Sequence, residues 1–139
     1  PIGVLIDAES EALLFDKKAH EPINPAELTC LMTLYTALKL SEIQSNGAET
    51  SVLVDYEDTQ HSQSSRRIYL VSGTKVPLQT LLQSIAVVGA EDSCLTAARF
   101  LSGNYTAFVK EMNRFARNIG MNDSLFTFPI AAPNQKSSA

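Results

Sequence analysis

Residues 91–120 read EDSCLTAARFLSGNYTAFVKEMNRFARNIG, and they decide the fold class because they encode two successive helices. The first helix is predicted to begin at residues 91–93 (EDS) and to end at Gly103, with three apolar residues on its inner face: Leu95, Ala98 and Leu101. The second begins near Thr106 and ends at Gly120. Its inner face carries Phe108, Met112, Phe115 and Ile119 at helical spacing. This part of the chain is therefore predicted to be helical and buried on one side.

Two further helices are predicted upstream of this segment. One opens at Pro77, carries Leu78, Leu81, Leu82 and Ile85, and ends at Gly89. The other has Asn24 as its N-cap, Pro25 at its first position, Glu27 as a capping-box carboxylate and Gly47 as its end. Its predicted buried face consists of Leu28, Leu31, Met32, Tyr35 and Leu38.

The N-terminal region is predicted to be a β-hairpin of residues 3–7 (GVLID) and 11–15 (EALLF). Residues 51–56 suggest a short strand, the polar residues 58–67 an exposed loop, and residues 66–71 an extended segment. The expected fold class is α+β, with the hairpin packed on a mostly helical body. Residues 1–128 would form one domain, and residues 129–139 a loose tail.

Composition limits the classes of function. The chain has 139 residues, of which 45% are hydrophobic and 19% charged, as in an ordinary soluble domain. Its net charge of −4 argues against a nucleic-acid binder, which needs cations against phosphate. No apolar run approaches the length of a membrane-spanning helix. The spacing of its two cysteines matches no zinc motif.

The order of these pieces resembles a known family. The hairpin GVLIDAESEALLF, the helix start NPAELTCLMT, the segment SGTKVPLQTLLQSI and the stretch from Glu91 to Phe126 together resemble the low-molecular-mass penicillin-binding proteins. These are serine-type D-alanyl-D-alanine carboxypeptidases, which trim peptidoglycan stem peptides. The resemblance covers nearly the whole chain and implies a truncated transpeptidase-like domain without the later strands of its sheet. It also implies a bacterial periplasmic or cell-envelope location and no cofactor or metal.

The catalytic motifs of that family are S-x-x-K, S-x-N and K-T-G. Serine and lysine share one face of a helix because they are three residues apart, so the amine can take the hydroxyl proton. Here Glu27 stands at the serine position and Cys30 at the lysine position. The S-x-N position reads Gly89-Ala90-Glu91, and the chain ends before a K-T-G strand. The sequence therefore predicts no intact catalytic residue.

Two other strings match these motifs without their context. Ser72-Gly73-Thr74-Lys75 spells S-x-x-K, but Gly73 and the following Val76-Pro77 predict a turn. Ser102-Gly103-Asn104 spells S-x-N but is better explained as the end of a helix.

The replacement residues suggest two alternatives to a dead site. Cys30 could be a thiol nucleophile, but no base is close in sequence, and His20 and His61 lie in polar stretches typical of solvated loops. The resemblance also implies that Cys30 and Cys94 approach each other across the former cleft. They could form a disulfide in an oxidising compartment, but two separate buried thiols are the favoured prediction.

We expect an inactive homologue that acts as a binding or assembly module of the envelope. The alternative is an active D-alanyl-D-alanine carboxypeptidase whose site is completed by missing residues or a partner chain. The open hairpin edge predicts self-association or a protein partner. A peptidoglycan peptide is a further candidate ligand, but Glu27 and Glu91 would repel its terminal carboxylate.

Overall fold

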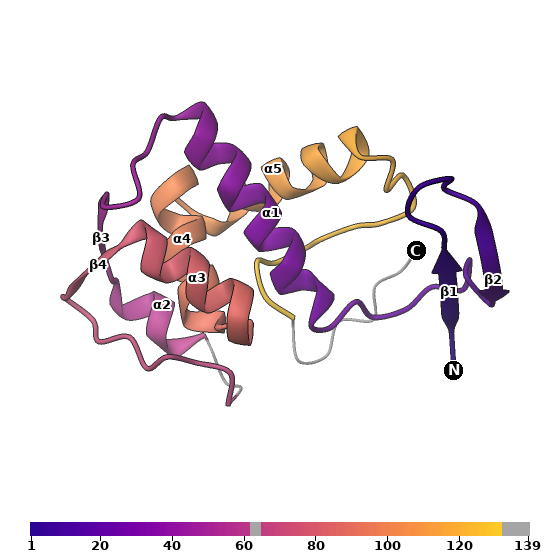
Figure 1. Ribbon diagram of the computed structural model, residues 1–139. Helices are drawn as coiled ribbons and strands as arrows, with labels where there is room; N and C mark the ends of the chain where they lie inside the picture. The colour runs from indigo at the N-terminus through magenta and orange to yellow at the C-terminus, as the bar shows by residue number, and fades with distance from the viewer. Residues whose placement is uncertain (62–64, 132–139) are drawn as a thin grey trace.

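The computed structural model describes residues 1–61 and 65–131 (Figure 1). Its elements in chain order are β1 (Gly3–Ile6), β2 (Leu13–Lys17), α1 (Leu28–Ile43), β3 (Ser51–Leu53), α2 (Tyr56–Gln60), β4 (Lys75–Pro77), α3 (Leu78–Val88), α4 (Glu91–Ser102) and α5 (Tyr105–Asn118). The predicted α+β class is confirmed. The helices α3, α4 and α5 begin and end within two residues of the predicted positions.

Helix α4 is the centre of the helical body, since it packs against α1, α2, α3 and α5, and α1 packs in turn against α3, α4 and α5. One core cluster lies where α1, α4 and α5 meet, and it includes Met32, Leu101 and Phe108. A second lies where α1, α3 and α4 meet, and it includes Cys30, Leu81 and Leu95. The three helices around α1 thus bring the beginnings of α1 and α4 into one packed layer.

The buried face of α1 is not the predicted one. Met32 is buried and Tyr35 partly buried, but Leu28, Leu31 and Leu38 are exposed. The residues that face the other helices are mostly small: Thr29, Cys30, Thr33, Thr36 and Ala37, with Met32 and Leu40. Small side chains let three neighbouring helices approach the axis closely, whereas α1 is too apolar all round for spacing alone to identify the inner face.

The polar stretch after β3 is also more ordered than predicted. Residues 58–67 were expected to be an exposed loop, but Asp58 is fully buried in the short helix α2. Strand β4, which the sequence did not indicate, pairs antiparallel with β3, with Val52 opposite Val76. Residues 62–64 lie outside the described part of the chain.

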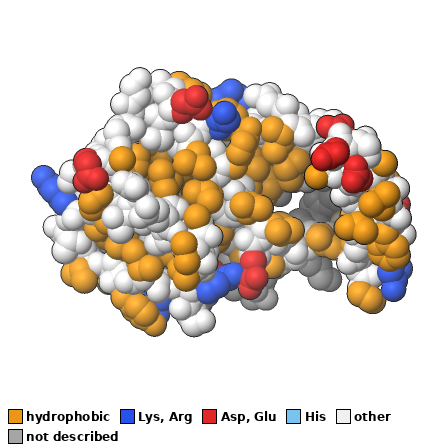
Figure 2. All heavy atoms as spheres, in the orientation of Figure 1, with side chains coloured by type: hydrophobic (Ala, Val, Ile, Leu, Met, Phe, Trp, Pro, Cys, Tyr) orange, Lys and Arg blue, Asp and Glu red, His pale blue; other side chains and the backbone are white. Residues whose placement is uncertain are grey.

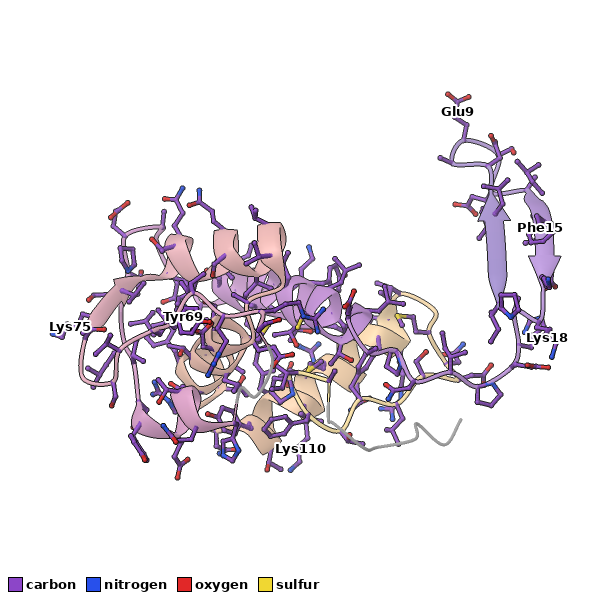
Figure 3. The ribbon with its side chains drawn as sticks, turned by 90° about the horizontal axis from the view of Figure 1, so that it is seen from below. Glu9, Phe15, Lys18, Tyr69, Lys75 and Lys110 are labelled. Carbon is purple, nitrogen blue, oxygen red and sulfur yellow. The ribbon has the colours of Figure 1, made fainter. Side chains whose placement is uncertain are left out.

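The predicted hairpin forms, with Leu5 opposite Phe15 in an antiparallel pair. It does not pack on the helices as expected: in Figures 1 and 3 it stands apart from the body, with Glu9 at its tip and Lys18 at its base. Apolar residues cover it in Figure 2 and are exposed on both strands: Val4, Leu5, Ile6, Leu13, Leu14 and Phe15. Because apolar side chains alternate onto both faces of a strand, one helical layer could not bury them all.

The domain boundary predicted at Pro129 falls inside the packed region, because Ile130 is buried in the second core cluster. The backbone carbonyl of Pro129 also accepts a hydrogen bond from the Thr33 hydroxyl on α1. The rest of the predicted tail, residues 132–139, lies outside the described residues. Within the described chain, no helix is both long and apolar enough to cross a membrane.

Candidate functional site at the start of helix α1

Helix α1 begins at Leu28, three residues later than a helix with Pro25 at its first position would. Ala26 has a positive φ of 43°, which interrupts the helical conformation before Glu27. The Asn24 side chain does accept a hydrogen bond from the Ala26 N–H at 3.0 Å, but this bond closes a turn that precedes the helix. Glu27 is the N-cap and makes no side-chain cap bond, so the predicted capping box is wrong.

The Glu27 carboxylate forms an ion pair instead. Its Oε1 lies 2.8 Å from the Arg66 guanidinium, and Arg66 also reaches Oε1 of Glu91 at 3.4 Å. The Glu27 side chain is 78% exposed and that of Glu91 only 5%. One arginine therefore joins Glu27 and Glu91, the residues that the sequence resemblance predicts to stand at the catalytic serine and asparagine positions.

The segment that carries Arg66 is fixed on the start of α4. The Arg66 carbonyl accepts the Glu91 N–H at 2.9 Å. The Asp92 carboxylate accepts the N–H groups of Ile68 and Leu70 at 3.3 and 3.0 Å. Sequence analysis did not identify Arg66, because it lies in a polar stretch far along the chain from both glutamates and belongs to no motif.

Arg66 changes the electrostatics expected from the sequence. From the sequence alone, the negative charges of Glu27 and Glu91 have no partner and are expected to repel the carboxylate of a ligand. In the structure the guanidinium lies against both, so the three groups together carry one net negative charge instead of two. The acidic residues are consequently a weaker barrier to an anionic ligand than their sequence suggests.

Cys30 and Cys94 are brought together in the layer between α1 and α4. Both are free thiols, buried at 3% and 0% exposure, and both belong to the second core cluster. The hydrogen bond from Cys94 lowers the pKa of Cys30, and Arg66 lowers it further against the opposing effects of burial, Glu91 and Glu27. Burial raises the pKa of Cys94 well above its usual value, and so does its bond to Cys30. Cys30 is therefore the thiol that ionises first, with Cys94 as its donor.

Residues 89–91, where the sequence resemblance predicts the S-x-N position, form the junction between α3 and α4. Gly89 ends α3 in the left-handed conformation with φ of 63°, which an L side chain rarely adopts, and Ala90 is the buried N-cap of α4. Of that motif's three positions, only Glu91 carries a polar side chain, and it faces Arg66.

The other candidate residues lie elsewhere. Gly73 turns the chain with φ of 82°, as predicted for the S-x-x-K string, and Lys75 begins the unpredicted strand β4. Gly103 ends α4 as predicted, and Asn104 caps α5 through the Ala107 N–H at 2.8 Å. His20 is exposed. His61 packs its ring edge-on to Tyr105 and Phe128, with centroids about 6 Å away.

The site thus combines a carboxylate held by a guanidinium with a buried pair of thiols. At the two positions where the family has a hydroxyl and an amine, this chain presents an acid and a thiol. Within residues 1–61 and 65–131, no group of three or more histidine, cysteine, aspartate or glutamate side chains is arranged to hold a metal ion.

Comparisons with known proteins agree on one family. The family model described as D-alanyl-D-alanine carboxypeptidase matches residues 2–139. The chain is 31% identical to the D-alanyl-D-alanine carboxypeptidase DacA of Haemophilus influenzae, over 98% of this chain and 35% of that protein. It is 28% identical to DacF of Bacillus subtilis, over 91% of this chain and 32% of that protein. The chain therefore spans about a third of the length of the curated relatives that it matches.

Solved structures give the same result. Penicillin-binding protein 5 from Haemophilus influenzae superposes with a TM-score of 0.88 at 26% identity, over 94% of this chain and 38% of that one. The D-alanyl-D-alanine carboxypeptidase DacD from Francisella tularensis superposes with a TM-score of 0.85 at 27% identity, over 97% of this chain and 32% of that one. The fold is consequently that of part of a penicillin-binding protein domain.

Proposed function

This chain belongs to the D-alanyl-D-alanine carboxypeptidase family, and we propose that it is a catalytically inactive member. In this proposal it acts as a binding or assembly module in the periplasm or cell envelope of a bacterium. The names of its relatives support a role linked to peptidoglycan. The observation that carries the inactivity is the pairing of Glu27 with Arg66 at the position of the catalytic serine.

The chemistry follows from the side chains at that position. Acyl transfer in the family needs a hydroxyl nucleophile and an amine that takes its proton. Glu27 has no hydroxyl, and its attack on an amide would give an anhydride. Cys30 stands where the resemblance places the amine, and it is buried in one cluster with Cys94, a thiol and not a base. Oxyanion contacts alone would leave about 10³–10⁴-fold acceleration over water, by analogy with serine proteases stripped of their triads.

We expect that a fluorescent penicillin does not become covalently attached to the purified chain. The ester that traps β-lactams in this family requires an activated serine, and Glu27 cannot form it. The measurement is in-gel fluorescence of the denatured protein after incubation with excess label. Escherichia coli DacA, labelled in parallel, serves as the positive control.

Stoichiometric labelling of this chain would overturn the proposal and favour the alternative of an active carboxypeptidase. A Cys30→Ala variant then tells which atom is acylated. Loss of the label in that variant would identify a thioester on Cys30, and retention would point to a hydroxyl that sequence alignment misplaced.

The assembly role is supported by the hairpin, and we propose a second copy of this chain as its partner. Strand β1 reads GVLI and carries no charge or proline, the usual protection of an open edge. Strand β2 carries Asp16 and Lys17 on its own edge. Two β1 strands related by a two-fold axis near Leu5 would pair antiparallel and join two exposed hairpins into one larger sheet.

We expect Leu5→Lys to raise the dissociation constant of this dimer about tenfold or more, because two lysines would face each other across the axis. Sedimentation velocity over a concentration series measures it. Val87→Lys on α3 is the matched control, since Val87 is 82% exposed and far from the hairpin in the chain. A wild-type chain that stays monomeric at every concentration, or equal weakening by both variants, would contradict the proposed partner.

A further inference from the structure

The thiols of Cys30 and Cys94 are both buried in the second core cluster, and the proposed function does not use them. Cys30 lies in the first turn of α1 and Cys94 in the first turn of α4. The two helices pack against each other, and the two cysteines belong to one buried cluster. Neither thiol therefore needs a large backbone movement to reach the other.

We propose that Cys30 and Cys94 form a reversible intramolecular disulfide that cross-links α1 to α4, with a small-molecule or protein disulfide as the oxidant. The inference is independent of the proposed function, since it concerns the thiols and not acyl transfer. In this proposal Cys30 and Cys94 are a site of redox modification and not of catalysis.

The reaction balances as two thiol–disulfide exchanges. The Cys30 thiolate attacks one sulfur of an oxidant RSSR, forms a mixed disulfide and releases RS⁻. Cys94 then loses its proton and attacks the Cys30 sulfur, which forms the Cys30–Cys94 bond and releases the second RS⁻. The protein loses two electrons and two protons, and RSSR is reduced to two RSH.

The order of attack follows from the surroundings of each sulfur. Cys30 ionises first, because Cys94 donates to it and Arg66 lies nearby. The first turn of a helix adds a favourable partial charge for a thiolate and is also the part of a helix that opens most readily. Cys94 is fully buried, so an external oxidant meets Cys30 first and Cys94 acts as the resolving thiol.

The experiment equilibrates the folded, reduced chain with oxidised glutathione, blocks remaining thiols with N-ethylmaleimide and measures the intact mass. We expect a species that has lost two hydrogen atoms and takes up no maleimide when denatured, together with a peptide that joins the segments of Cys30 and Cys94. Its melting temperature should exceed that of the reduced chain by about 10 °C, because the bond closes a long loop. Dithiothreitol should reverse both changes.

Cys30→Ala and Cys94→Ala are the controls, and each should show no redox-dependent melting shift. If either variant does not fold, the mass and the linked peptide of the wild-type chain decide alone. Two maleimide adducts on the chain after full equilibration, or a cross-link that forms only in urea, would overturn the proposal.

Discussion

Replacement of Asp58 by alanine is expected to lower the free energy of unfolding by about 3 kcal/mol, the low end of the cost of breaking a buried ion pair. Asp58 on α2 is fully buried and accepts hydrogen bonds from the Arg99 guanidinium on α4 at 2.7 to 3.1 Å. It also accepts the Tyr105 hydroxyl at the start of α5 and the Asp55 N–H. One carboxylate thus holds three helices together.

The donors would be left without their acceptor in the variant. Burial, followed by the bond to Asp58, raises the pKa of Tyr105 well above its usual value, so its phenol stays a donor at neutral pH. The Arg99 side chain is 25% exposed and keeps a bond to the Leu53 carbonyl, which is why we place the cost at the low end of the range.

Urea denaturation measures this cost, and a double-mutant cycle separates it from general damage. If Asp58 and Arg99 act as one unit, Asp58→Ala combined with Arg99→Ala should be destabilised by much less than the sum of the single variants. Glu111→Ala is the matched control, because its pair with Arg114 is partly exposed and should cost less than about 1 kcal/mol. Additive single effects, or equal costs for Asp58 and Glu111, would contradict the assigned role.

The helices that carry large apolar residues on one side could be predicted closely. In α5, Phe108, Met112 and Phe115 are buried as their spacing indicates, whereas Ile119, predicted on the same face, is exposed just after the helix. Gly89 and Gly103 end α3 and α4 as expected. The face of α1 could not be predicted in this way. Its inner residues are mostly small ones, threonines with a cysteine and an alanine, that fit between close helices, while leucines such as Leu31 remain exposed. The spacing of apolar residues identifies a buried face only where that face is the most hydrophobic one. In α1 the buried face is instead the one whose small side chains allow the neighbouring helices to come close.

The candidate site was only partly accessible from sequence. The resemblance placed Glu27, Cys30 and Glu91 in the former cleft, and the structure brings these elements together. The role of Arg66 and the fixed placement of residues 66–70 could not be predicted from the sequence. They depend on hydrogen bonds of Asp92 and Glu91 to backbone that is far away along the chain. The same applies to Asp58, whose partners Arg99 and Tyr105 come from other helices. Such charge networks leave no period in a sequence.

Replacement of Phe108 by alanine is expected to cost about 4 kcal/mol, the middle of the range for a large-to-small change in a core. Phe108 is fully buried in the first core cluster, where α1, α4 and α5 meet. Met32, Leu101 and Met112 belong to the same cluster, and each is held on a different helix, so the cavity could close only by moving a whole helix.

Urea denaturation of Phe108→Ala and Phe108→Met compares loss of volume with change of shape. Methionine retains most of the volume and can bend to fill the space, so its cost should stay near 1 kcal/mol. Because the described chain leaves the hairpin and one face of α1 exposed, this cluster carries a large share of the total stability, and Phe108→Ala should be close to unfolding at 37 °C. An alanine variant as stable as the methionine variant would show that the helices can close around the gap. It would also show that α1 is held mainly by the layer around Cys30 and Cys94.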